Sequence, residues 1–230
     1  MRPGIVDRMT GVTPAKSSRP ATWIGLFIAF FGMLIVRQAV SYFYPTLTLP
    51  AAVWKESLIW ICVIGLLFVI WRGEGLSLRS VGIGTASWNK SLLWSLPLVV
   101  ICFLVGGILV AITHYGHGEG SEAFGKLPVW LVSLICLRAG IAEELFFRGY
   151  AIERLQSLGL SRFWAAAIPL VVFAVGHWTG GWANIVIALA LGAVLSAFYL
   201  SRRDLVANMI AHFLVDFVPN VLPRLFSHDR

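Results

Sequence analysis

The sequence predicts an all-α fold, a polytopic membrane helix bundle of about seven transmembrane helices. Hydrophobic residues make up 58% of the 230 residues and charged residues only 13%, whereas roughly a quarter of the residues in soluble domains are charged. The apolar residues also gather in runs close to the length of about 20 residues that crosses the hydrocarbon core of a bilayer. These features exclude a secreted disulfide scaffold, a coiled coil and a disordered chain.

Seven apolar stretches are expected to cross the membrane. The fourth is longer than one crossing requires, and Arg148, Glu153 and Arg154 make its second half amphipathic. We therefore expect it to continue beyond the membrane or to tilt strongly. The segment 76–90 is too polar to cross and is expected along the inner surface. The seven predicted spans are residues 23–44, 53–71, 91–114, 127–157, 162–178, 182–201 and 204–222.

The basic residues outside these spans and at their ends predict the orientation, because short cytoplasmic loops carry an excess of Lys and Arg. With the N-terminus inside, eleven such residues are cytoplasmic and three are external. The net charge of +7 then follows from topology, and no nucleic-acid partner is needed. We expect a cytoplasmic leader at 1–22, one transmembrane domain at 23–222 and a tail at 223–230, with membrane lipid as a partner.

The cysteines and several familiar catalytic patterns offer no alternative site. Cys62, Cys102 and Cys136 lie in apolar stretches without CxxC spacing, so we expect free packing residues. The patterns HExxH, GxSxG and GxGD are missing, and the glycine-rich stretch at 116–122 fits none of them.

Polar residues inside the predicted spans are candidates for function. A charge at mid-membrane costs about 2.5 to 3.5 kcal/mol on insertion scales, so such residues usually face the bundle interior. Among the other acids, Glu56 is expected near a span end, Glu74 and Asp204 in loops, and Glu153 on the amphipathic extension. Six residues remain as site candidates: Glu143, Glu144, Arg148, His177, His212 and Asp216.

Helical spacing predicts how these residues pair. At about 3.6 residues per turn, Glu144 and Arg148 share a face in the order that favours an ion pair. Glu143 points roughly 100° away and is free to face another helix. His212 and Asp216 repeat the four-residue spacing.

The depth of these residues along their helices predicts that those of the fourth and fifth spans meet. A turn centred at Gly159 places Glu143 and His177 at nearly the same level, whereas His212 lies shallower by on the order of 10 Å. Phe173 is expected to be a packing residue. Arg138 is off the face of Glu143 and is expected to pair elsewhere, with Asp216 as a candidate.

These residue types suit hydrolysis. A carboxylate and an imidazole that converge on one water share its deprotonation, as Glu143 and His177 could. A second imidazole oriented by a carboxylate donates to an oxyanion, as His212 and Asp216 could. Alternatively, Glu143, His177 and His212 could hold zinc, because two His and one Glu form a known catalytic ligand set. The residue types leave both mechanisms open.

The same residues carry a resemblance to a known family. EELFFR at 143–148, FAVGH at 173–177 and HFLVD at 212–216 match EExxxR, FxxxH and HxxxN/D. They follow the order and separations of the CPBP family, which contains CAAX-prenyl proteases and bacteriocin-processing (Abi) proteins. The resemblance covers a core at about 127–222. One departure is Asp216, where the CAAX-protease branch usually has Asn; Asp adds negative charge beside an oxyanion.

The resemblance implies an intramembrane endopeptidase that hydrolyses a peptide bond of a membrane-associated protein or peptide, in the bacterial cytoplasmic membrane. It implies that Glu143 and His177 activate water, that Glu144 and Arg148 brace the site, and that His212 with Asp216 stabilises the oxyanion. Both metal-dependent and metal-free mechanisms have been described for the family, so the cofactor stays open between a divalent metal such as zinc and none.

A non-enzymatic interpretation also fits the buried charges. A scaffold, an immunity factor or a small proton-coupled transporter would use the same acids as an interhelical network or a proton relay. Glycine- or proline-broken spans in matching halves, which are typical of transporters, do not occur.

Overall fold

The computed structural model describes residues 19–115 and 124–226, and the prediction of a polytopic helical bundle is confirmed. Within these residues five helical segments are long and apolar enough to span a membrane: Arg19–Phe43, Leu49–Gly73, Trp88–Thr113, Trp178–Arg202 and Leu205–Phe226. The elements in chain order are α2 (Arg19–Phe43), α3 (Leu49–Phe68), η1 (Val69–Gly73), η2 (Leu78–Val81), α4 (Trp88–Thr113), α6 (Val129–Arg138), η3 (Ala139–Ile152), α7 (Glu153–Ser157), α8 (Arg162–Val175), η4 (Trp178–Gly180), α9 (Gly181–Arg202) and α10 (Leu205–Phe226).

Each predicted span corresponds to a helical segment, although the boundaries differ. Helix α2 begins at Arg19, inside the predicted leader, and α10 continues to Phe226, inside the predicted tail. Helix α8 has 14 residues and is shorter than a full crossing. The remaining parts of the predicted leader and tail, and the glycine-rich stretch at 116–122, lie outside the described residues.

Local sequence signals explain several helix boundaries. The Thr48 hydroxyl accepts a hydrogen bond from the Ala51 amide and caps α3, which has Pro in its first turn. Ser161 caps α8 in the same way, through the Trp164 amide. The predicted turn at Gly159 is confirmed, because α7 ends at Ser157 and Gly159 has a φ of 100°, which glycine adopts without a steric penalty.

The fourth predicted span is the central element of the bundle. It runs without interruption through α6, η3 and α7, and η3 is a π-helix in contact with α10, α8, α2 and α6. All residues of η3 except Ile141 are buried. The expected amphipathic second half is therefore wrong, because Arg148 and Arg154 are paired inside the protein rather than exposed.

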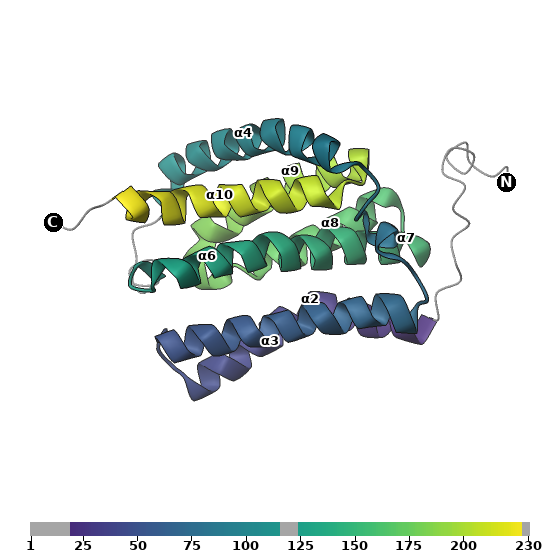
Figure 1. Cartoon of the computed structure of the whole chain (residues 1–230), viewed down its shortest axis with the longest axis horizontal. Helices are drawn as coiled ribbons and strands as arrows, with labels where there is room; N and C mark the ends of the chain where they lie inside the picture. The colour runs from purple at the N-terminus through teal and green to yellow at the C-terminus, as the bar shows by residue number, and fades with distance from the viewer. Residues whose placement is uncertain (1–18, 116–123, 227–230) are drawn as a thin grey trace.

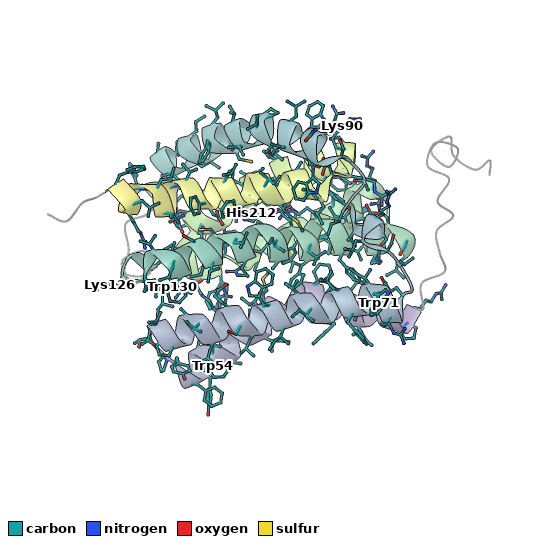
Figure 2. All side chains as sticks on the ribbon, viewed as in Figure 1. Trp54, Trp71, Lys90, Lys126, Trp130 and His212 are labelled. Atoms are coloured by element: carbon teal, nitrogen blue, oxygen red, sulfur yellow. The ribbon has the colours of Figure 1, made fainter. Side chains whose placement is uncertain are left out.

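The other helices surround this central element in layers (Figure 1). The pair α2 and α3 lies along one side and α4 along the opposite side, while α8, α9 and α10 lie between them together with the central element. Large apolar side chains on the outside of α2, α3 and α4 are exposed, as lipid contact requires. Tryptophans occur at both ends, Trp54 and Trp130 at one end and Trp71 at the other (Figure 2), and this distribution is typical of membrane interfaces.

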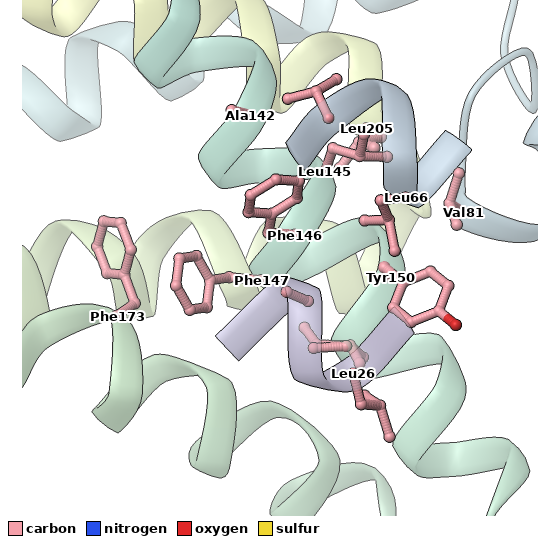
Figure 3. Close-up of a cluster of buried hydrophobic side chains, with 14 of the residues drawn as sticks. Leu26, Leu66, Val81, Ala142, Leu145, Phe146, Phe147, Tyr150, Phe173 and Leu205 are labelled. Carbon is pink, nitrogen blue, oxygen red and sulfur yellow. The ribbon is translucent and has the colours of Figure 1, made fainter. Parts of the chain in front are cut away.

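Aromatic and aliphatic side chains pack the central helix against its neighbours (Figure 3). The rings of Phe147 and Phe173 lie 5.3 Å apart in an edge-to-face arrangement, which joins η3 to α8. Tyr150 and Leu26 join η3 to α2 in the same cluster. The cysteines are free, and Cys102 and Cys136 are buried as expected.

Gly140 allows the backbones of η3 and α10 to approach closely. A Cβ atom at this position would lie 2.8 Å from the Met209 carbonyl oxygen and 3.0 Å from the Phe213 amide. Because backbone atoms cannot move aside, we expect Gly140→Ala to destabilise the fold by roughly 1 to 3 kcal/mol. Thermal unfolding of the detergent-purified protein measures this loss. Gly107→Ala on α4, where no atom lies within 4 Å, is the matched control and should leave the unfolding temperature unchanged.

Candidate active site

The π-helix changes which side chains share a face. Because hydrogen bonds in a π-helix join residues five apart, Arg138 and Glu143 fall on the same side. The Nη1 atom of Arg138 donates to Oε1 of Glu143 at 2.7 Å. Its Nε and Nη2 atoms donate to the two carboxylate oxygens of Glu56 on α3, at 2.8 and 3.4 Å. The expectation that Arg138 lies off the face of Glu143 and pairs with Asp216 is therefore wrong.

Glu144 is the most deeply buried carboxylate of the site, with no exposed surface. The predicted ion pair is present: Arg148 donates from Nη1 to Oε1 of Glu144 at 2.7 Å. The same oxygen lies 2.7 Å from Nδ1 of His212, and Oε2 accepts from Asn208 at 3.0 Å. Arg148 extends this contact to α9 through the hydroxyl of Ser196 at 3.4 Å. The network joins η3, α9 and α10.

His212 lies in the interior of the bundle (Figure 2), and the carboxylates of three acidic residues lie within 4 Å of its ring. Because the Glu144 carboxylate accepts hydrogen bonds, Nδ1 of His212 carries the hydrogen. Its Nε2 atom lies 3.9 Å from Glu143 and 3.6 Å from Asp216. Glu144, rather than Asp216 as expected, makes the short hydrogen bond that orients this ring.

The expected depth difference between His212 and Glu143 is absent, since their side chains lie within 3.9 Å. The physical reason is again the π-helix. A helix closed by five-residue hydrogen bonds places more residues in each turn than an α-helix, so Glu143 lies nearer to the turn at Gly159 than α-helical spacing predicts.

His177 lies just beyond α8 and precedes the short helix η4, rather than inside a long span. Its Nδ1 atom lies 2.8 Å from the carbonyl oxygen of Phe173. A carbonyl oxygen only accepts, so Nδ1 donates and Nε2 keeps its lone pair. Through the Phe173 ring, which neighbours both imidazoles, His177 lies close to His212. The structure thus brings it to the same group of residues, as predicted.

Phe173 connects the parts of the site. Its ring centroid lies 4.7 Å from the His177 ring and 6.4 Å from the His212 ring, and the Arg148 guanidinium lies 4.3 Å from it. The ring therefore neighbours both imidazoles and covers the arginine, in addition to the packing role expected from the sequence.

Arg37 of α2 holds the segment that contains His177. Its Nη1 atom donates to the carbonyl oxygen of Gly176 at 2.8 Å, and its guanidinium lies 5.6 Å from the Trp178 ring. Both neighbours of His177 in the chain are thus in contact with the N-terminal pair of helices. The sequence indicated nothing of this contact.

Three further residues belong to the site and were missed. Glu56 was expected near a span end, Arg138 was expected to pair elsewhere, and Asn208 was not considered. All three are buried and bonded to Glu143, to Glu144 or to each other. For Asn208 a signal existed, since it is an amide inside an apolar span one helical turn before His212.

The residues suggested for zinc do not form a metal site in the part of the chain that the structure describes. No group of three or more His, Cys, Asp or Glu side chains at residues 19–115 and 124–226 is arranged to hold an ion. The Oε1 atom of Glu143 is bound by Arg138. A divalent cation on Glu143 would also be repelled by the adjacent guanidinium.

Burial decreases from one side of the site to the other. Glu144 and Arg148 are fully enclosed, Glu143 and His212 are nearly so, and His177 and Asp216 are partly exposed. The Asp216 side chain is 38% exposed. A substrate would therefore approach from the side of His177 and Asp216, while the Glu144–Arg148 pair supports the site from behind. Such a site can deprotonate a water and stabilise negative charge in a setting with little solvent.

Fold and site together define a class of protein: a polytopic membrane protein with a group of carboxylates and imidazoles inside its helix bundle. Residues 125–218 match the family model described as "Type II CAAX prenyl endopeptidase Rce1-like". The match confirms the resemblance to the CPBP family of CAAX proteases and contains all six predicted site residues. No curated protein and no solved structure matches the chain.

Proposed function

We propose that this protein is an intramembrane endopeptidase of the CAAX type, which cleaves a membrane-associated peptide or protein with a water activated by Glu143 and His177. The family match supports a protease of this type with a peptide substrate in a membrane context. The observation that carries the proposal is the fixed orientation of the two imidazoles. Each has its Nδ1 atom held by an acceptor, at 2.8 Å for His177 and 2.7 Å for His212, which leaves each Nε2 for the reaction.

In this mechanism, Glu143 and Nε2 of His177 together take a proton from the attacking water. The carboxylate oxygen Oε2 of Glu143 serves this step, because Oε1 is bound to Arg138. The hydroxide adds to the scissile carbonyl carbon, and a tetrahedral oxyanion forms. The captured proton then passes to the leaving amine as the C–N bond breaks.

His212 would stabilise the oxyanion by donating from Nε2. This requires a hydrogen on both ring nitrogens. The carboxylates of Glu143, Glu144 and Asp216 lie within 4 Å of the ring and supply the counter-charge for such an imidazolium. Glu144 and Arg148 fix the ring without touching the substrate.

The experiment is cleavage of a lipid-anchored peptide reporter by the protein purified in detergent, followed with and without a chelator. We expect cleavage to continue after chelation, because the proposed water activation uses side chains alone. Loss of activity on chelation, with recovery on adding zinc, would instead support metal chemistry at the same side chains. Reporters with a prenyl chain, an acyl chain and no chain determine which anchor the substrate carries.

We further propose a bacterial cytoplasmic membrane location, on the basis of the compact size of the chain and the family resemblance. The distribution of Lys and Arg supports an N-terminus in the cytoplasm. A scaffold or transporter role is the alternative outcome of a genetic test. If a deletion phenotype were rescued by Glu143→Ala, peptide hydrolysis would not be the function that the cell requires.

A further inference from the structure

We propose that Glu56 and Arg138 form a positioning pair for Glu143, so that helix α3, which lies outside the segment matched to the protease family, is part of the working site. The inference rests on the proposed function, because it assigns Glu143 the task of activating water. It adds two residues and one structural element to that site.

The first argument is the geometry of Arg138. One guanidinium contacts two carboxylates: it donates to Glu143 at 2.7 Å, and to Glu56 at 2.8 and 3.4 Å. The planar fork of an arginine fixes direction as well as distance, which a lysine ammonium does not. Arg138 therefore determines where the Glu143 carboxylate points.

The second argument is burial. Glu56, Arg138 and Glu143 have exposed fractions of 6, 7 and 9%. A buried charge is strongly destabilising without a partner, so the group is constrained to keep its contacts. Arg138 alone would neutralise Glu143, whereas Glu56, which also has Lys55 at 4.0 Å, shares the charge of the guanidinium. Glu56 thus leaves Glu143 available as a base while Arg138 holds it.

The third argument is that the two carboxylate oxygens of Glu143 have different partners. Arg138 takes Oε1, and Oε2 is the oxygen that faces His212 at 3.9 Å. Without the arginine, the carboxylate would be free to rotate and to bind His212 through either oxygen. The pair therefore holds the reactive oxygen toward the His212 imidazole.

A matched control exists within the same chain. Glu74 is also 6% exposed and forms an ion pair of 2.8 Å with a buried arginine, Arg154, as Glu56 does with Arg138. Its other partners are Thr22 and Tyr150, and it contacts none of the proposed site residues. Glu74→Gln therefore removes an equivalent buried charge away from the reaction.

The test compares kcat and KM for Glu56→Gln and Glu74→Gln with the lipid-anchored reporter, normalised to folded protein. We expect Glu56→Gln to lower kcat roughly 10- to 100-fold with little change in KM, because a small misplacement of a catalytic group can cost about 100-fold. Glu74→Gln should keep the wild-type kcat. Equal losses in both variants, or full activity in Glu56→Gln, would overturn the positioning role.

Arg138→Lys gives a second measurement. A lysine keeps the charge but cannot hold both carboxylates in the same fork, so we expect partial activity. In the double variant Glu56→Gln/Arg138→Lys the two losses should not multiply, because coupled residues act as a unit. Multiplying losses would show two independent effects and would contradict the inference.

Glu143→Gln in the same assay separates this inference from the proposed function. If Glu143→Gln is inactive and Glu56→Gln is fully active, only the positioning pair is wrong. If Glu143→Gln is active, the proposed mechanism fails, and the positioning pair fails with it.

Discussion

Replacing Glu143 by glutamine is expected to lower kcat roughly 100- to 10,000-fold, the usual contribution of a positioned general base. Glutamine keeps the size of the side chain and can still accept a hydrogen bond from Arg138, but it cannot take a proton from water. Reporter cleavage with the purified variant measures the loss.

Asn220→Ala is the control for this substitution. Asn220 lies on the same helix as His212 and donates only to the backbone carbonyl of Asp216, at 2.8 Å. We expect near wild-type activity from it. Cleavage by Glu143→Gln at the wild-type rate would remove Glu143 from the role of base.

Replacing Arg148 by methionine is expected to give the largest loss of stability, on the order of 3 to 5 kcal/mol, because removing one partner of a buried ion pair leaves an uncompensated charge. Glu144 has no exposed surface, and Arg148 is its cationic partner at 2.7 Å. Methionine approximates the length of arginine, so the effect reports the lost charge more than a cavity. Thermal unfolding in detergent measures it.

The matched comparison is Arg203→Gln, which removes the partner of Glu153 at the loop between α9 and α10. The Arg203 side chain is 47% exposed, and exposed pairs contribute about 0 to 1 kcal/mol. An Arg148→Met variant that unfolds at the same temperature as Arg203→Gln would contradict the account of the Glu144 network. A restored unfolding temperature in Arg148→Met/Glu144→Gln would support it, since that variant removes the unpaired charge as well.

Much of the fold could be predicted from the sequence, because the length of an apolar run and the spacing of residues along one helix are local properties of the chain. The helical segments, the turn at Gly159 and the Glu144–Arg148 pair follow from such short-range features. The six polar residues inside the predicted apolar spans were identifiable for the same reason. A charged residue in a membrane-spanning segment is energetically costly and usually has a function.

The rest of the site depends on backbone geometry and tertiary contacts, which residue spacing along one helix does not predict. The pairing of Arg138 with Glu143 requires a π-helix, and spacing arguments assume 3.6 residues per turn. The role of Glu56 depends on a contact with a residue 82 positions away in the chain, and the role of Arg37 depends on a contact with a residue 139 positions away. The short bond between Glu144 and His212 replaced the expected one with Asp216 because tertiary packing, rather than sequence spacing, selects the partner of a ring.

The most direct measurement of the central claim is cleavage of the lipid-anchored reporter in water enriched in oxygen-18, with mass analysis of both fragments. Hydrolysis by an activated water predicts one heavy oxygen in the new C-terminal carboxylate of the wild-type product, and no product above background from Glu143→Gln. An intact reporter with the folded wild-type protein, or equal labelled product from Glu143→Gln, would contradict the claim that Glu143 activates the water in this bundle.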